Sequence, residues 1–453
     1  MKSKIDKNNL LFSNKALIAL LIPIVIEQLL NSFMGMIDTM MVSNVGSEAL
    51  SGVSLVDSVN NLIVQLFSAM ATGAAIICSH YIGMKDEKGA NKAARQVVLS
   101  VTVIALVITV LGLAFKRPLL GAIFGKVDDG VMNNALKYFL FTALSYPFLA
   151  LFSAGSAIFR SCGNSKYPMT VSVISNVINI IGNYILIFVF DMGVSGAAIS
   201  TLVSRIICMV AVFIALAKPK QEIVVSNYAS IRPEWGLIKS ILAIGIPSGI
   251  ENSMFQFGKL AIQSTVSTMG TAAIAAQAMT NILENVNGIF GIGVGMCLMT
   301  VVGQCMGAGR KDEAKYYIVK LCGIAEVGII ASCLLVYAFT KPVTMLAGME
   351  SESAALCMEM VAAITIAKPL VWVGSFVPAY GLRAAGDVKF SMTTSIITMW
   401  GCRVALCIFL VKAFGMGPMA VWYGMFADWT LRSIIFISRY LSGAWMKKEV
   451  IKA

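Results

Sequence analysis

The chain repeats itself after 224 residues, and this internal repeat limits the possible folds more than any other feature. The recurring positions include Pro23 and Pro247, Glu27 and Glu251, and Gly46 and Gly270. A second block recurs at nearly the same spacing, where FRSCGNSK at 159–166 resembles LRAAGDVK at 382–389. The repeated segments are apolar and long enough to cross a bilayer, so each half is one multi-helix unit that is used twice.

The apolar segments predict twelve membrane-spanning helices, since one span needs about 20 apolar residues. The predicted spans are 16–41, 52–78, 97–115, 134–157, 168–190, 195–217, 240–265, 273–301, 317–340, 357–380, 391–411 and 419–441. Each half holds an even number of spans, so both copies enter the membrane from the same side. We therefore expect an all-α integral membrane protein of two six-helix lobes, related by a pseudo-two-fold axis along the membrane normal. Secondary transporters often place a site at the interface of such repeats.

The repeat also predicts the domain organisation. We expect an N-lobe at 1–217, a cytoplasmic linker at 218–239, a C-lobe at 240–441 and a basic cytoplasmic tail at 442–453. The first apolar segment is full length and lacks a small-residue cleavage site, so it is interpreted as a retained helix.

Composition and charge agree with a membrane protein. Apolar residues make up 58% of the chain and charged residues 13%, and the net charge is +12. The basic residues lie mostly in short loops on one side of the predicted spans, the positive-inside pattern. This pattern predicts a multi-pass protein of the cell (plasma or inner) membrane with both termini in the cytoplasm. It argues against nucleic acid as a partner.

The residues that several functional classes require are missing from this sequence. The chain has a single histidine, His80, and ten cysteines without metal-site spacing. We therefore predict no metal site and no cofactor. An intramembrane enzyme would need a catalytic dyad, a metal or a recognisable nucleophile, and none is visible. There is no G-x-x-x-x-G-K-[ST] loop for ATP, so energy must come from an ion gradient or from another chain.

A set of motifs resembles the multidrug and toxic compound extrusion (MATE) family over roughly residues 15–441. The set comprises IPIVIEQ…IDTMMVSNVGSEAL, its counterpart IGIPSGIEN…STMGTAAIAA, the two R-x-x-G-[ND]-x-K loops, N-x-x-N-x-x-x-N within 168–190, and GVSGAAISTLVSR. The resemblance implies a cation-coupled antiporter that exports small organic, often cationic, amphipathic compounds. We expect it to act as a lipid-embedded monomer. An alternative within transport is a flippase for lipid-linked precursors.

Polar residues inside the first span lie on one helical face. Glu27, Asn31 and Asp38 are spaced i, i+4, i+11, which keeps them on one side of a helix. Glu27 and Asp38 are about 16 Å apart along the axis, so they belong to separate sites.

The resemblance implies a cation-coupling site in the N-lobe. It assigns this site to Asp38, Asn179, Asn183 and Thr201, whose oxygens suit either H⁺ or Na⁺. The asparagine side chains could instead form hydrogen bonds that hold neighbouring helices together. A single formal charge in the cluster leaves the choice of ion open.

The C-lobe departs from the sodium-coupled branch of that family. Phe255 and Trp372 stand where that branch has acids, so the resemblance implies that this lobe lacks a cation site. Charged residues in its spans could form ion pairs, such as Glu251 with Lys368 or Glu284 with Lys259. These pairs either fix helix packing or form a charged cavity wall.

Glu27 and Glu251 occupy equivalent repeat positions, four residues after equivalent prolines. They either cap backbone groups that the prolines leave unpaired or act in the gates of the two lobes. Asp428 and Arg432 are spaced i, i+4 and are expected to pair with each other.

Bulky apolar residues are expected to form an adaptable substrate cavity. The cavity candidates are Phe33, Met34, Phe255, Phe257 and Trp372.

Overall fold

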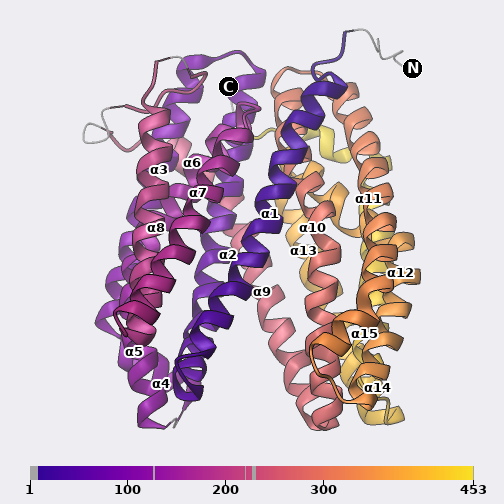
Figure 1. Cartoon of the computed structure of the whole chain (residues 1–453). Coiled ribbons are helices and arrows are strands. Elements are labelled where there is room, and N and C mark those ends of the chain that lie inside the picture. Colours follow the sequence, from indigo (N-terminus) through magenta and orange to yellow (C-terminus); the bar gives the residue numbers. More distant parts are fainter. Residues whose placement is uncertain (1–8, 126–127, 220, 227–230, 452–453) are drawn as a thin grey trace. The chain divides into compact units, whose positions relative to one another are not determined.

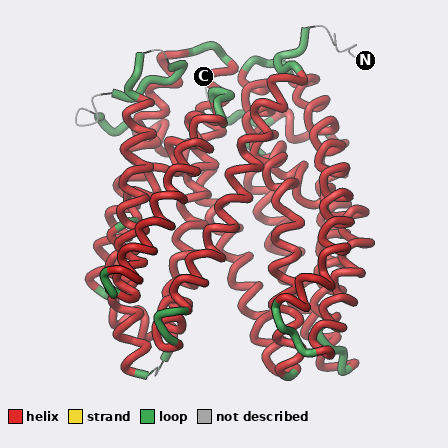
Figure 2. Tube along the Cα trace, viewed as in Figure 1, coloured by secondary structure: helices red, strands yellow, loops and turns green. Residues whose placement is uncertain are grey.

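The structure, a computed structural model, describes residues 9–125, 128–219, 221–226 and 231–451. These residues form helices joined by short loops, with no β-strand among them (Figures 1 and 2). Two compact units result. The N-terminal unit is Ile18–Gly249, and the C-terminal unit combines Ile250–Ala453 with the start of the chain up to Leu17.

The N-terminal unit is built from helices that are mostly apolar. They are α1 (Asn14–Ser43), α2 (Ser47–Gly83), α3 (Glu87–Ala114), α4 (Lys116–Phe124), α5 (Asp129–Leu144), α6 (Tyr146–Ser161), α7 (Lys166–Asn183), the π-helix η1 (Tyr184–Val189) and α8 (Gly193–Leu216). η1 continues α7 without a break, so the two form one span. The first half of α9 (Trp235–Val266) packs here too, and a Cβ at Gly73 of α2 would stand 3.0 Å from the backbone oxygen of Ile241.

The C-terminal unit repeats the order of elements. It contains the second half of α9, the short η3 (Ser267–Met269), α10 (Thr271–Gly307), α11 (Lys311–Leu346), α12 (Ser351–Ala384), α13 (Val388–Thr398), the π-helix η4 (Met399–Ala405), α14 (Leu406–Phe414), α15 (Met419–Ser442) and η5 (Ala444–Lys447). The start of the chain packs against α11, where the Phe12 amide donates to the Tyr317 hydroxyl at 2.9 Å.

The repeat is visible in the helix boundaries. α2 begins at Ser47 and α10 at Thr271, the offset of 224 residues found in the sequence, and both helices have 37 residues. The residues before them, Gly46 and Gly270, adopt φ angles of 134° and 95°. Such angles are open to glycine and strained for other residues. The same turn is therefore used twice.

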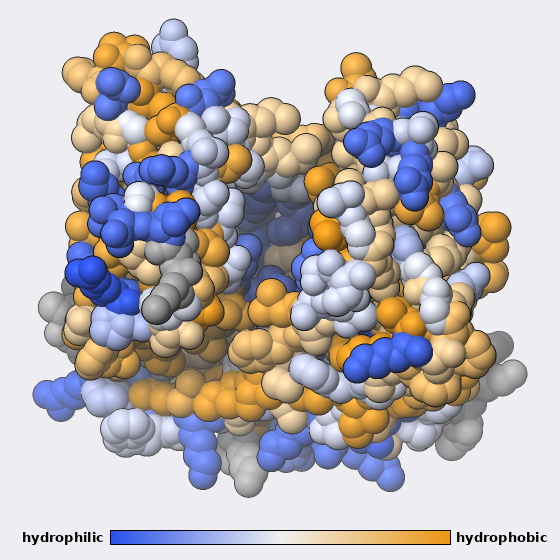
Figure 3. Space-filling model, turned by 90° about the horizontal axis from the view of Figure 1, so that it is seen from below, coloured by the Kyte–Doolittle hydropathy of each residue, from blue (hydrophilic) through white to orange (hydrophobic). Residues whose placement is uncertain are grey.

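Twelve helical spans account for the fold, six in each half, as predicted. Nine helices of the described chain are long and apolar enough to cross a membrane, and α5 with α6, bent by 43°, supplies a tenth. α9 and α15, which carry charged residues in mid-helix, complete the set. Large apolar side chains are exposed along the helices, among them Val103, Val110 and Leu334, as contact with lipid requires. Figure 3 looks at one end of the helices, where hydrophilic and hydrophobic side chains are mixed.

The predicted linker packs on the N-terminal unit. Ile223 and Val225 are buried in a core with residues of α2, α6 and α8. Asn91 of α3 accepts a hydrogen bond from the Val224 amide at 2.7 Å, and Lys92 pairs with Glu234 at 2.7 Å. This stretch is thus a packed connection in the residues that the structure describes.

Candidate functional site

The polar face of α1 lies against α6 and α7. Glu27 is buried and forms an ion pair with Arg160 of α6 at 3.1 Å. One turn on, Asn31 accepts a hydrogen bond from the Ser172 hydroxyl of α7 at 3.2 Å. The interpretation of Glu27 as a cap for backbone near Pro23 does not describe this geometry. The backbone carbonyl that a proline leaves unpaired is a hydrogen-bond acceptor, and an ionised carboxylate, also an acceptor, cannot bond to it. Arg160 supplies the donors that the Glu27 carboxylate needs.

Asp38 lies at one end of a chain of contacts between the predicted coupling residues. Asn183, the last residue of α7, donates to Asp38 Oδ1 at 2.7 Å. Asn183 also lies 3.3 Å from Asn179 Oδ1, and Asn179 lies 3.3 Å from Thr201 Oγ1 of α8. The structure therefore brings all four residues together, with Asn179 and Asn183 on one face of α7.

The Asn179 amide has two orientations with different consequences for Asp38. With its nitrogen toward Asp38, it donates to Oδ1 at 2.9 Å and its oxygen faces Thr201. With the amide reversed, its nitrogen donates to Thr201 and its oxygen faces the carboxylate. Two oxygens at that distance need a proton or a cation between them. Asn183 Oδ1 is also buried without a hydrogen-bond partner among the described residues.

A second polar cluster lies beside Asp38 and was missed in the sequence analysis. Asp57 of α2 accepts hydrogen bonds from the Asn60 amide at 3.2 Å and from the Tyr138 hydroxyl. Asn60 in turn accepts from the Tyr146 hydroxyl at 2.7 Å. The signal was present, because an ionisable residue within a predicted span asks for a functional or structural reason.

Arg205 of α8 links the two clusters. Its guanidinium donates to Ser145 Oγ at 2.6 Å, and its charge acts on both Asp57 and Asp38. Two carboxylates thus share one fixed cation, which leaves room for one further positive charge, a proton or a cation, near Asp38.

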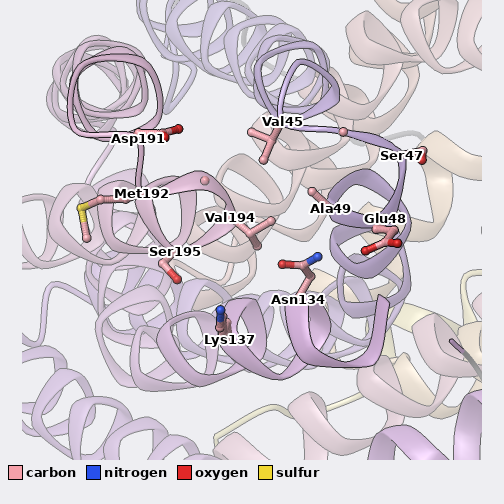
Figure 4. A pocket seen from close by; sticks show the side chains of 12 residues that line it. Val45, Ser47, Glu48, Ala49, Asn134, Lys137, Asp191, Met192, Val194 and Ser195 are labelled. Atoms are coloured by element: carbon pink, nitrogen blue, oxygen red, sulfur yellow. The ribbon is translucent and has the colours of Figure 1, made fainter. Parts of the chain in front are cut away.

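A cavity of about 480 Å³ opens beyond this cluster in the same unit. It is lined by the end of α1, the start of α2, one side of α5 and the turn into α8. Figure 4 shows Glu48 and Asp191 on opposite sides of it, with Asn134 and Lys137 of α5 between them. None of the four predicted coupling residues lines it. The cavity is therefore a polar recess near the ends of the helices that carry them.

The C-terminal unit contains an ion pair equivalent to Glu27–Arg160. Glu251, the repeat counterpart of Glu27, pairs with Arg383 at 3.2 Å. Arg383 is the repeat counterpart of Arg160. The suggested pairing of Glu251 with Lys368 was wrong, because the arginine at the end of α12 reaches the carboxylate instead.

The remaining charges of this unit pair differently from the suggestion as well. Lys368 is fully buried and pairs with Glu284 at 2.9 Å, which leaves Lys259 outside that pair. Lys259 instead has its ammonium 5.0 Å from the centroid of the Phe255 ring. Separately, the expected Asp428–Arg432 pair is confirmed at 2.9 Å, and Arg403 joins it at 2.7 Å.

The predicted cavity residues are divided between buried and exposed positions. Met34 and Trp372 are buried, whereas Phe33 and Phe257 are about half exposed. Phe255 is partly buried between two cationic side chains, since Arg403 also lies 5.2 Å from its ring centroid. Aromatic and charged groups are therefore combined at Phe255.

Comparison with known proteins agrees with this architecture. The MatE family model matches residues 23–185 and 247–409, one match in each repeat. An uncharacterized transporter, YisQ of Bacillus subtilis (strain 168), is 28% identical over 99% of this chain and 97% of its own length. A probable multidrug resistance protein, NorM of Thermotoga maritima, is 27% identical over the same shares of the two chains.

Among solved structures, a crystal structure of MATE in complex with MaL6 is similar in fold. It has a TM-score of 0.89 at 20% identity and covers 96% of this chain and 97% of that one. The family match extends over most of both halves, and the fold agrees with it. The chain therefore belongs to the MatE family of multi-pass membrane transporters and is not an enzyme.

Proposed function

We propose that this transporter exports amphipathic, often cationic organic compounds in exchange for H⁺ or Na⁺, and that Asp38 carries the coupling ion. Export driven by an ion gradient is general to the family, and it requires no cofactor. The proposal adds the residues that would bind the ion in this chain: Asp38, Asn179, Asn183 and Thr201.

One observation carries the proposal: a carboxylate lies beside a buried amide oxygen that lacks a partner. Asn183 donates its nitrogen to Asp38, while its own oxygen accepts nothing among the described residues. A buried acceptor without a donor is unfavourable. A bound cation would give that oxygen a partner, and either a cation or a proton on Asp38 would neutralise the excess negative charge beside Arg205.

Exchange follows if the ion and the substrate stabilise different conformations. Occupancy of the Asp38 cluster would favour one state of a two-state equilibrium, and substrate would favour the other. The ion gradient would then bias the cycle toward export.

The test uses purified protein in proteoliposomes with two fluorescent probes, ethidium as a cation and dansylglycine as an anion. Transport is measured under an imposed Na⁺ gradient and, separately, under an imposed pH gradient. Asp38→Asn should abolish gradient-driven transport while the protein remains folded and inserted. Asp128→Asn, an exposed change in the same unit, is the matched control. Transport by Asp38→Asn at a rate near wild type would remove Asp38 from the mechanism.

We also propose a monomer in the cell membrane with both termini in the cytoplasm. The charge asymmetry of the loops supports this orientation. Single cysteines at Glu87 and Asp128, both exposed, would test it in a variant lacking the ten native cysteines. An impermeant thiol reagent added to intact cells should label position 128 and not position 87, and the reverse pattern would overturn the orientation.

A further inference from the structure

Two cations of the C-terminal unit contact one aromatic ring. The Lys259 ammonium lies 5.0 Å from the Phe255 ring centroid, and the Arg403 guanidinium lies 5.2 Å from the same centroid. Lys259 and Phe255 are one turn apart on α9, whereas Arg403 comes from η4. Cation–π contacts favour each cation singly, but they do not remove the repulsion between the two positive charges.

Close backbone packing holds Arg403 at this position. A Cβ at Gly424 of α15 would stand 2.7 Å from the backbone oxygen of Arg403, and a Cβ at Gly258 of α9 would collide with the Met399 side chain. The close approach of α15 to η4 therefore requires glycine at position 424, and Gly258 of α9 leaves room for the Met399 side chain. Arg403 is consequently fixed against Phe255 by the packing of three elements.

The nearby carboxylates are already engaged. Glu284 pairs with Lys368 at 2.9 Å, and Asp428 is shared by Arg403 at 2.7 Å and Arg432 at 2.9 Å. Within the described chain, Lys259 makes no ion pair. Its charge interacts with those of Glu284 and Arg403, which indicates that it points toward α10 and η4.

The cluster therefore has four cations and two carboxylates. Its members are Lys259, Lys368, Arg403, Arg432, Glu284 and Asp428. Inside membrane spans, uncompensated charge is unfavourable and is usually found where a ligand or water reaches it. Lys259 lies at an exposed position of α9, whereas Arg403 is buried and already paired with Asp428.

We propose that Lys259, whose ammonium contacts the Phe255 ring, binds an anionic group of the transported compound, a carboxylate or a sulfonate, and that the buried Arg403 on the same ring adds its positive charge to the site. The substrate class is then aromatic or apolar compounds that carry an acidic group, either as anions or as zwitterions. This inference deepens the proposed export function. Only the statement that the bound compound is transported rests on that function. Binding itself needs neither Asp38 nor an ion gradient.

The test measures equilibrium binding of two matched probes to the purified protein in an uncharged detergent. Dansylglycine carries a carboxylate, and dansyl amide has the same aromatic group without it. Wild type should bind dansylglycine more tightly. Lys259→Gln should weaken dansylglycine binding about 10- to 100-fold, the loss expected for one charge-assisted contact, and should leave dansyl amide binding unchanged. Lys412→Gln, an exposed lysine of α14, is the control and should change neither.

Further arms separate the remaining outcomes. Repeating the titration in chloride and in gluconate buffer tests whether a free inorganic anion fills the site, and stronger dansylglycine binding in gluconate would show competition at Lys259. Phe255→Leu, which keeps both cations but removes the ring, should weaken both probes. Equal affinity of wild type for the two probes in gluconate, or equal effects of Lys259→Gln and Lys412→Gln, would overturn the proposal. Neither result bears on coupling, which the transport assay of Asp38→Asn decides.

Discussion

The two units share one ion pair and differ in nearly every other charge within their spans. Glu27–Arg160 and Glu251–Arg383 join equivalent positions of the repeat, at 3.1 Å and 3.2 Å. Both carboxylates follow a helix proline by four residues, and both arginines end a helix that precedes an R-x-x-G loop. We propose that a feature kept in both copies serves the fold that the copies share; a role in the gates of the two units is the alternative.

The residues of the candidate coupling site have no chemical counterparts in the second copy. The positions 224 residues after Asp38, Thr201 and Arg205 are occupied by Ile262, Met425 and Trp429. Conversely, the position equivalent to Lys259 is Gly35.

The polarity of the two units differs as a result. In the N-terminal unit Asp38 and Asp57 share one cation, Arg205, whereas four cations of the C-terminal unit share two carboxylates. Duplication supplied the scaffold, and divergence gave one copy an excess of acid and the other an excess of base. This contrast is the basis for assigning ion coupling to the first unit and an anionic substrate group to the second.

The largest effect on stability is expected for Asp428→Asn. This change leaves the guanidiniums of Arg403 and Arg432 buried and close together without their carboxylate, which should cost about 3–5 kcal/mol. Asp38→Asn should cost less than about 1 kcal/mol, because an amide can still accept the hydrogen bond from Asn183. Size-exclusion profiles of heated detergent extracts would measure both. Similar melting of the two variants would break the distinction between a structural and a functional acid.

The shared ion pairs should be equally costly to break. Arg160→Met and Arg383→Met each leave a buried carboxylate without its cation and should lower the free energy of unfolding by about 3 kcal/mol. The double changes Glu27→Gln with Arg160→Met, and Glu251→Gln with Arg383→Met, should recover most of the loss, because no lone charge remains. The same heating assay applies. If only one pair of the two affected stability and the other affected transport alone, that pair would be a gate rather than a fold element.

Sequence patterns predicted the fold and the N-terminal cluster better than the ion pairs. Span lengths and helical spacing are local properties, and the repeat is visible in the sequence itself, so the twelve spans and the shared face of α1 followed from them. The partner of Glu251 is 132 residues away, and several cations lie within a plausible reach along the chain. The packing of α9 and α12 decides which of these cations pairs with Glu251, and residue spacing along the chain does not predict that packing.

Asp57 and Arg205 were missed for a different reason. Asp57 lies outside the motifs that carry the family resemblance, and Arg205, the last residue of GVSGAAISTLVSR, is given no role by that resemblance. Their placement in apolar spans was a sufficient signal, since ionisable residues there are rare. The geometry adds that they are neighbours of Asp38, which a single sequence does not reveal.

Asp57→Asn should weaken transport less than Asp38→Asn does. With Asp57 neutral, the charge of Arg205 is balanced by Asp38 alone, and its attraction would hold Asp38 in its ionised, ion-free state. Loss of one charge at this range is worth about 1–2 kcal/mol, so the apparent affinity for the coupling ion should fall about tenfold or more. Transport rates measured against Na⁺ or H⁺ concentration would show the change as a shift in the half-saturating concentration. With Asp128→Asn as control, an unshifted curve for Asp57→Asn would confine the ion site to the Asp38 cluster.

The smallest effect is expected for Asn179→Ala. Asn179 contributes one amide to the Asp38 cluster and contacts Thr201 at 3.3 Å, while Asn183 holds Asp38 directly at 2.7 Å. Removing Asn179 should therefore weaken coupling about threefold, as for one hydrogen bond between membrane helices, and Asn183→Ala should weaken it more. Asn176→Ala is the matched control, because Asn176 lies one turn earlier on α7 and its amide nitrogen has no partner in the described chain. The half-saturating ion concentration again reports the effect. If Asn176→Ala shifted it as much as Asn179→Ala, these asparagines would act through helix packing, and only Asp38 and Asn183 would remain as ion ligands.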